Sequence, residues 1–311
     1  MTLNRIHKNL PPQSSSYQKL IQEHPWLAVA VSPKEYLAPS YYEKLLKPYT
    51  FDGSSDLEVF SRFLSERKSG ELKILEIGAG TGRGTSVTLQ IAQSPVLHLL
   101  DQSKQMLQYC QERFSNFRGL EFLEADAITY LGTTDETYDE VYSLWSFSHS
   151  IHQNLHRWGF DRGVKIVKQS LVSFLRLNLK ANGRVFIIHF DARSPEQTIL
   201  LKQKSKLYPF FKVGEQSPSQ SILDEVLREL ENERVLRYSV AHYNGQEIEF
   251  ADQEEALEIF MNFHLEGIFN HSEILGEVLE GLTRDLMKYA TTAGTIRIKP
   301  ACFVYSCSKC A

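Results

Sequence analysis

The chain has 311 residues, of which 42% are hydrophobic and 23% are charged, a composition that excludes wholesale disorder. Its formal net charge of -4 gives no general attraction for nucleic acid, and no stretch approaches the roughly 18 apolar residues of a membrane span. The N-terminus lacks the apolar region of a secretory signal. Four cysteines are too few for a disulfide scaffold, so we expect a reducing, cytoplasmic setting and no role for the C-terminal pair Cys307 and Cys310.

The predicted elements divide the chain into three segments. Residues 1–70 predict aromatic-rich helices without a strand pattern. Residues 71–192 alternate short apolar strands with amphipathic helices, which predicts a parallel sheet covered on both faces. An Asn182-Gly183 pair should end the last of these helices. Residues 193–311 predict further helices and a final strand that contains Pro300, where we expect a bulge or an edge because proline cannot donate to the ladder.

A glycine-rich turn follows the first predicted strand, in the sequence Glu76-Ile-Gly78-Ala-Gly80-Thr-Gly82. Glycines permit a tight turn and the close approach of a ligand, and the free N–H groups at the start of the next helix favour polar ligand groups. The usual dinucleotide fingerprint has its third glycine where this chain has Arg83. The turn by itself is therefore weak evidence for any one cofactor.

Two acidic residues end the next two predicted strands. Asp101 follows Gly82 by 19 residues (101 − 82) and begins the pattern D-x-S-x-x-M-L. A carboxylate at this place can accept hydrogen bonds from both hydroxyl groups of a ribose. Asp126-Ala127 ends the third strand, where a carboxylate can accept from an adenine amino group and a backbone N–H can bind a ring nitrogen.

These three motifs, in this order and spacing, resemble those of the class I S-adenosylmethionine-dependent methyltransferases. The resemblance covers about residues 70–192. It implies an α/β Rossmann-like fold with a seven-stranded, mostly parallel sheet, an antiparallel last strand, a helical N-terminal lid and a helical C-terminal insertion. It also implies S-adenosylmethionine as cofactor and S-adenosylhomocysteine as product. The cofactor-binding residues that we predict on this basis are Glu76, Gly78, Gly80, Gly82, Asp101, Gln102, Asp126, Ala127 and Ser143.

A finer resemblance concerns the C-terminal third and the aromatic N-terminal segment. Residues 256–269, followed by a helix and a lone last strand, look like the histamine N-methyltransferase group. Two features differ from that group: the segment after the fourth strand is longer, and the amide residue of the last strand is replaced near Ile298-Lys299. The resemblance thus implies an amine-methyltransferase architecture and does not extend to histamine itself.

Side chains that follow the fourth predicted strand are candidates for the acceptor site. Methyl transfer is an in-line displacement, so positioning supplies much of the catalysis, and a base is needed only when the acceptor arrives protonated. We predict His149 or His152 as that base, and Trp145 and Phe147 as contacts of the acceptor. The alternatives are packing roles or, for the histidines with His156 at helical spacing, a metal site; we predict no metal.

Other candidates lie outside this segment. Tyr17 and Tyr42 are predicted to contact the acceptor from the N-terminal lid, with packing as the alternative. Residues 202–211 carry three lysines beside aromatic residues, which favours either a contact with an acidic or aromatic substrate or a solvated helix end. His189 lies inside a predicted strand and is expected to be a core histidine with its hydrogen bonds satisfied.

The predicted function is N-methylation of a small amine or imidazole-type acceptor. Alternatives are C- or O-methylation of a natural-product intermediate, methylation of a peptide or protein, and a cofactor-binding subunit without catalysis. We expect a monomer or homodimer whose partner is the small-molecule acceptor, with neither nucleic acid nor a membrane.

Overall fold

The computed structural model describes residues 15–29, 46, 49–67, 71–93, 95–265, 268–269 and 272–311. The chain divides into two compact units, each assembled from separate stretches. One, which we call the sheet unit, comprises Tyr49–Asp191, Gln216–Gln246 and Ala301–Ala311. The other, which we call the helical unit, comprises Met1–Pro48, Ala192–Glu215 and Glu247–Pro300.

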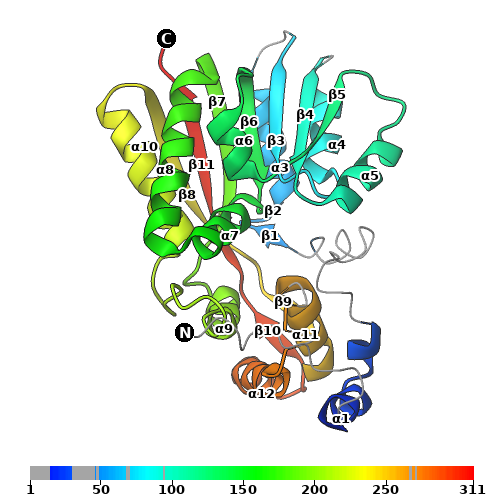
Figure 1. The fold of residues 1–311 in the computed structure, drawn as a ribbon. Helices are drawn as coiled ribbons and strands as arrows, with labels where there is room; N and C mark the ends of the chain where they lie inside the picture. The colour runs from blue at the N-terminus through cyan, green and yellow to red at the C-terminus, as the bar shows by residue number, and fades with distance from the viewer. Residues whose placement is uncertain are drawn as a thin grey trace. The chain divides into compact units, whose positions relative to one another are not determined.

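The sheet unit is built on a seven-stranded sheet (Figure 1). In spatial order its strands are β5 (Leu120–Glu124), β4 (Val96–Asp101), β3 (Lys73–Ile77), β6 (Tyr138–Leu144), β7 (Leu179–Phe190), β11 (Ala301–Lys309) and β8 (Leu236–Asn244). Neighbouring strands from β5 to β7 are parallel, and β11 is antiparallel to both β7 and β8. The predicted seven-stranded, mostly parallel sheet with an antiparallel last strand is therefore confirmed.

Helices cover both faces of this sheet, which is why its central strands are apolar nearly throughout. Ile74 and Leu75 of β3, for example, point to opposite faces and are both 0% exposed. The helices α6, α8 and α10 lie in front of the sheet in Figure 1. The helices of this unit are α3 (Asp56–Ser65), α4 (Arg83–Ile91), α5 (Lys104–Arg113), α6 (Ala127–Thr133), α7 (Phe147–Trp158), α8 (Phe160–Leu177) and α10 (Pro218–Asn232).

Helix α3 belongs to the sheet unit, so the predicted boundary at residue 70 is wrong. Phe63 packs on Phe186 of β7, with ring centroids 4.8 Å apart, and Phe60 lies 4.4 Å from Tyr142 of β6. A short hairpin of β1 (Thr50–Phe51) and β2 (Ser54–Ser55) leads into the helix. Sequence patterning missed this assignment because these rings are buried only by strands that come much later in the chain.

The helical unit contains the remaining described elements, and none of the helices in the described part of the chain is long and apolar enough to cross a membrane. Its helices are α1 (Ser15–Glu23), the 3₁₀ helix η2 (Pro25–Val29), α9 (Pro195–Lys204), α11 (Gln253–Ile259), the π-helix η3 (Phe260–His264), α12 (Leu275–Leu286) and the 3₁₀ helix η4 (Met287–Tyr289). Strands β9 (Ile248–Phe250) and β10 (Ile296–Ile298) form a two-stranded antiparallel sheet.

Two expectations about turns need correction. Asn182-Gly183 does not end a helix, because α8 already ends at Leu177 and the pair lies within β7. Asn182 has a left-handed φ of 57°, and the pairing of β7 with β6 shifts register there. Pro300 does not bulge a single last strand; it separates β10 of the helical unit from β11 of the sheet unit. Pro300 has no N–H to donate, and the chain leaves one sheet for the other at this residue.

Candidate active site

The glycine-rich loop lies at the carboxyl end of β3, beside the end of β6. Strands β3, β4 and β5 follow one another toward one edge of the sheet, and the strands from β6 onward lie toward the other edge. The strand order therefore reverses between β3 and β6, and open α/β sheets bind ligands at such a switch point. Gly78, Gly80 and Gly82 all have left-handed φ angles, of 70°, 54° and 78°. An atom added at the Cβ position of Gly80 would lie 4.0 Å from the nearest heavy atom, which leaves open space for a ligand.

Gly78 touches the segment that follows β6. A Cβ atom on Gly78 would lie 2.0 Å from the Ser146 Oγ and 2.3 Å from its Cβ. Ser146 is held there because its hydroxyl donates to the Ile77 carbonyl at 2.7 Å. The cofactor loop and the predicted acceptor segment are therefore in direct contact.

We expect Gly78→Ala to weaken S-adenosylhomocysteine binding by at least about tenfold, because overpacking costs about 1–3 kcal/mol and the left-handed φ adds strain. Isothermal titration calorimetry measures this. The matched control is Gly214→Ala, at φ 82° with no atom within 4 Å of the added methyl group. Ser146→Gly should partly restore binding to the Gly78→Ala variant; equal binding by Gly78→Ala and the wild type would contradict the contact.

Asp101 ends β4 and holds the loop from the other side. Its Oδ2 accepts the Gly80 N–H at 2.8 Å, and its Oδ1 accepts the Ser103 N–H at 2.8 Å. Burial raises the pKa of this carboxyl, while the backbone N–H groups act in the opposite direction. Asp101 is only partly buried and Gln102 is exposed, so both retain a face toward solvent. The carboxylate has lone pairs left for ribose hydroxyl groups, and with the open space at Gly80 these residues fit the predicted cofactor.

Glu76 supports the loop from beneath. Its side chain is in the core, at 3% exposed, where it accepts hydrogen bonds from the Thr85 hydroxyl and, at 2.8 Å, from the Tyr142 hydroxyl. Burial raises the pKa of Glu76 to about 7 despite these bonds. The resemblance implied that Glu76 and the glycines surround the amino-acid half of the cofactor; in the structure the Glu76 carboxyl instead ties β3 to α4 and β6.

Asp126 and Ala127 lie at the start of α6. Asp126 caps this helix by accepting the Thr129 N–H at 2.9 Å, and its other oxygen accepts from the Asn154 amide of α7 at 2.9 Å. The Asp126 side chain remains 12% exposed. Ala127 is buried, so a ligand could contact this residue through its backbone. Asp126, which we predicted to lie near the adenine of the cofactor, thus links α6 to α7.

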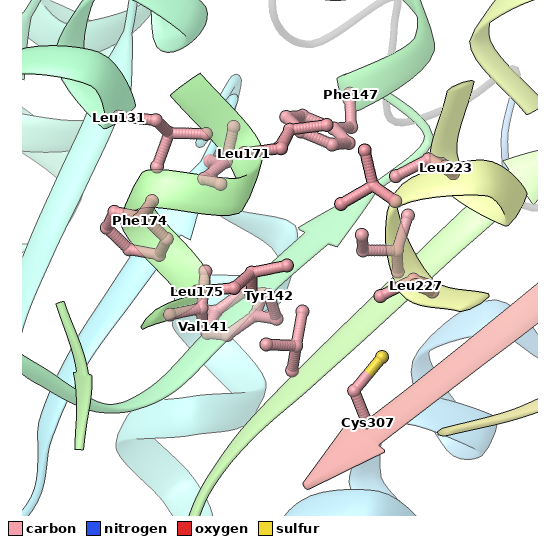
Figure 2. Close-up of a pocket in the computed structure, with 14 residues that line it drawn as sticks. Leu131, Val141, Tyr142, Phe147, Leu171, Phe174, Leu175, Leu223, Leu227 and Cys307 are labelled. Carbon is pink, nitrogen blue, oxygen red and sulfur yellow. The ribbon is translucent and has the colours of Figure 1, made fainter. Parts of the chain in front are cut away.

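Ser143 and Phe147 are placed in the interior, which differs from their predicted roles. The Ser143 hydroxyl is fully buried and donates to the Ile77 carbonyl at 2.9 Å. Phe147 is 2% exposed and lines an apolar cavity of about 30 Å³ with Leu171, Leu223 and other core side chains (Figure 2). Phe147 is the first residue of α7, and the face of that helix on which it lies packs inward. Phe147 therefore has a packing role, which was the alternative to a contact with the acceptor.

Trp145 follows β6 directly and remains partly exposed. Its φ is 71°, an unusual angle for a residue with a bulky side chain. The backbone N–H donates to the Ile188 carbonyl at 3.0 Å, and the indole N–H donates to the Asp56 carboxylate at 2.8 Å. The ring packs on Phe51, 5.5 Å away between centroids. The structure therefore brings Trp145 to the same sheet edge as the cofactor loop.

Histidines of α7 and β7 meet at the start of α10. The Ser219 N–H donates to His152 Nε2 at 3.4 Å, and the Ser219 hydroxyl lies 2.8 Å from His189 Nε2. A backbone N–H can only donate, so His152 Nε2 is the acceptor of this hydrogen bond. His189 is 1% exposed and its Nδ1 bonds to the Phe190 carbonyl at 2.7 Å, which confirms the predicted core histidine. His149 lies in the first turn of α7 and is partly exposed.

We expect the buried His189 to make stability depend on pH. Desolvation lowers its pKa to about 4, so between the unfolded pKa of roughly 6.5 and pH 4 the unfolded chain binds the extra proton. The stabilisation is therefore complete above about pH 6.5, and up to about 3 kcal/mol is lost as pH falls to 4. Urea unfolding from pH 7 to 4.5 should show a shallower decline for His189→Gln than for the wild type. His156→Gln, at an exposed position, should keep the wild-type slope.

The other candidates lie outside the sheet unit. Tyr17 is 5% exposed in α1, and burial raises its pKa. Tyr42 lies outside the described residues. In the 202–211 segment, Lys202 pairs with Asp285 at 3.0 Å and Lys206 with Glu277 at 2.9 Å, so these two lysines are engaged within the helical unit.

Among the described residues, no three His, Cys, Asp or Glu side chains are placed to hold a metal ion. The C-terminal cysteines lie in or next to β11, where residues three apart point to opposite faces. Cys307 points into the apolar cavity of Figure 2, and burial raises its pKa to about 12. Cys310 is partly exposed. The two thiols therefore do not converge on one ligand.

Comparisons with known proteins agree with this geometry. Residues 74–169 match the family model described as a methyltransferase domain. A proposed methyltransferase from Bacillus halodurans is 14% identical, with a TM-score of 0.50 over 83% of this chain and 100% of its own. The YcgJ protein of Bacillus subtilis is 15% identical, with a TM-score of 0.50 over 82% of this chain and 98% of its own. At this identity the two structures show the fold alone. No curated protein matches the chain.

The matched residues 74–169 include the glycine-rich loop, Asp101 and Asp126, and the strand order around them is that of a Rossmann-like methyltransferase. Residues 74–169 thus form a methyltransferase domain on a Rossmann-like sheet, and the enzyme is S-adenosylmethionine-dependent. The cofactor would supply the methyl group. Asp101 would hold its ribose, and the glycine-rich loop would hold it at the switch point of the sheet.

Proposed function

We propose that the enzyme methylates the nitrogen of a small amine or imidazole-type acceptor. The observation that carries this proposal is the partly exposed ring of Trp145, which lies at the sheet edge beside the cofactor loop. The indole N–H of Trp145 bonds to Asp56, and the ring packs on Phe51. An aromatic face stabilises a cation, the form in which most amines reach the enzyme.

A protonated amine must lose its proton before its lone pair can form the new N–C bond. His149 is our proposed acceptor of that proton. It lies four residues after Trp145, in the first turn of α7, and imidazole is the most frequent general base in enzymes. We favour it over His152, because His149 lies nearer to Trp145 in the chain, whereas His152 lies against Ser219 at the start of α10. Bound S-adenosylmethionine would supply the methyl group to the acceptor nitrogen, and His149 would take the proton that this nitrogen loses.

A substrate screen tests this proposal. The enzyme is incubated with methyl-labelled S-adenosylmethionine and panels of amines, imidazoles, phenols, carbon acids and peptides, and the products are analysed by mass spectrometry. We expect label on nitrogen of a small amine or imidazole. Label on oxygen, carbon or only on peptides would replace the proposal by the corresponding alternative. Cofactor binding without transfer to any panel member would instead favour a non-catalytic subunit.

A further inference from the structure

One buried carboxylate, that of Asp56, joins three parts of the sheet unit. Asp56 is the first residue of α3 and is 2% exposed. Its two oxygens each accept one hydrogen bond of 2.9 Å from the Arg83 guanidinium. Oδ2 also accepts the Trp145 indole N–H at 2.8 Å, and Oδ1 accepts the Leu57 N–H at 2.9 Å. A carboxylate with four hydrogen bonds, paired with a guanidinium, is an organised structural centre and has little capacity for a further ligand.

The partners of Asp56 come from the two segments that meet at the switch point. Arg83 is the first residue of α4 and directly follows Gly82 of the cofactor loop. Trp145 is the first residue after β6, where the acceptor segment begins. The Asp56 carboxylate is therefore a bridge from the cofactor loop to the acceptor segment, in addition to the contact of Gly78 with Ser146.

Trp145 needs such support because its backbone is strained. A non-glycine residue at φ 71° carries a cost of about 1–3 kcal/mol, which the surrounding structure must offset. Three hydrogen bonds hold the residue: its N–H donates to the Ile188 carbonyl, its carbonyl accepts from the Ser148 hydroxyl, and its indole N–H donates to Asp56. Without Asp56, the indole would have no hydrogen bond to any residue that the structure describes, and the ring would be oriented by its backbone and by the contact with Phe51.

We infer that Asp56 is a positioning residue, which fixes the Trp145 ring relative to the cofactor loop while Arg83 balances its charge. This inference rests on the proposed place of Trp145 in the acceptor site. Because Asp56 uses the indole N–H, Trp145 offers an acceptor its ring face and no hydrogen bond. The ring face recognises cationic and aromatic groups. Trp145 would therefore select a methyl acceptor by its charge or by stacking, and not by a hydrogen bond to the indole N–H.

The test uses Trp145 as its own reporter. The chain has three tryptophans, so Trp26→Phe with Trp158→Phe leaves Trp145 as the single fluorophore. In this background we expect Asp56→Asn to increase acrylamide quenching of Trp145 several-fold and to weaken the emission change on adding S-adenosylhomocysteine. The matched control is Glu58→Gln, which disturbs the capping box of the same helix without touching Trp145. Equal quenching in Asp56→Asn and in its parent would overturn the inference.

A second measurement does not depend on how Asp56→Asn folds. In the ¹⁵N-labelled wild type, the Trp145 indole N–H is assigned from its loss in Trp145→Phe. We expect its hydrogen exchange to be at least about tenfold slower than that of Trp158, whose side chain is 41% exposed. Exchange of Trp145 as fast as that of Trp158 would overturn the inference. Both measurements involve no acceptor and no turnover, so a negative substrate screen would reject the proposed function while leaving this result intact.

Discussion

Replacing His149 by glutamine should lower the rate of methyl transfer by about 10²- to 10⁴-fold, the usual contribution of a general base. The imidazole takes the proton that a protonated amine must lose, and an amide cannot do so at neutral pH. Affinity for S-adenosylhomocysteine should change little, because Asp101 and the glycine-rich loop lie on other elements. Single-turnover rates with the acceptor found in the screen, together with calorimetry of the product complex, measure the two effects.

The pH dependence makes this experiment specific. The loss in His149→Gln should shrink as pH rises toward the pKa of the free amine, since deprotonated acceptor then forms without help. His152→Gln should have a smaller effect, because His152 lies against Ser219 at the start of α10. His156→Gln, exposed on the same helix, is the control and should behave as the wild type. Full activity of His149→Gln from pH 6 to 10 would show that α7 only packs and that the acceptor loses its proton elsewhere.

Replacing Asp101 by asparagine should weaken cofactor binding by about 10- to 150-fold, equivalent to about 1.5–3 kcal/mol. Two losses contribute. The neutral amide gives weaker hydrogen bonds with the ribose hydroxyl groups than a carboxylate does. Asparagine also cannot accept both the Gly80 and the Ser103 N–H groups with separate oxygens, so the glycine-rich loop loses one of its fixed points.

Calorimetry with S-adenosylhomocysteine measures the Asp101→Asn affinity, and thermal unfolding of the free protein separates the two contributions. A lower melting temperature without ligand reports the loop contact, whereas a loss of affinity at unchanged stability reports the ribose contact. Glu112→Gln, which removes an exposed carboxylate from the adjacent helix α5, is the control for the change in charge. Unchanged affinity in Asp101→Asn would place the ribose contact on another residue.

Local signals in the sequence predicted the cofactor half of this enzyme. Each motif is short and lies at the end of a buried strand: the glycine-rich loop after β3, Asp101 at the end of β4 and Asp126 after β5. The left-handed φ angles at Gly78, Gly80 and Gly82 explain why glycine occupies these positions. Alternation of apolar strands and amphipathic helices likewise predicted the sheet, because both patterns arise from burial within a single element.

The proposed acceptor half depends on contacts between segments that are distant in the sequence. No motif in the sequence includes Asp56, yet its carboxylate meets Arg83 and Trp145, which are 27 and 89 positions away. Ser219 holds His152 and His189 across 67 and 30 positions. No local pattern encodes such pairs, since hydrogen bonds between side chains form only after the sheet brings the strand ends together.

The direction of individual side chains also depended on tertiary packing. Trp145 and Phe147 are two positions apart and have similar character in the sequence, but one bonds to Asp56 at the sheet edge and the other fills the core under α8. The turn at φ 71° between β6 and α7 separates them, and the fixed position of Asp56 offsets its strain. The sequence by itself thus determined the class of enzyme and its cofactor, because those depend on motifs within single elements. Only the tertiary structure decided which side chains lie beside the cofactor loop, because that depends on where segments that are far apart in the chain converge.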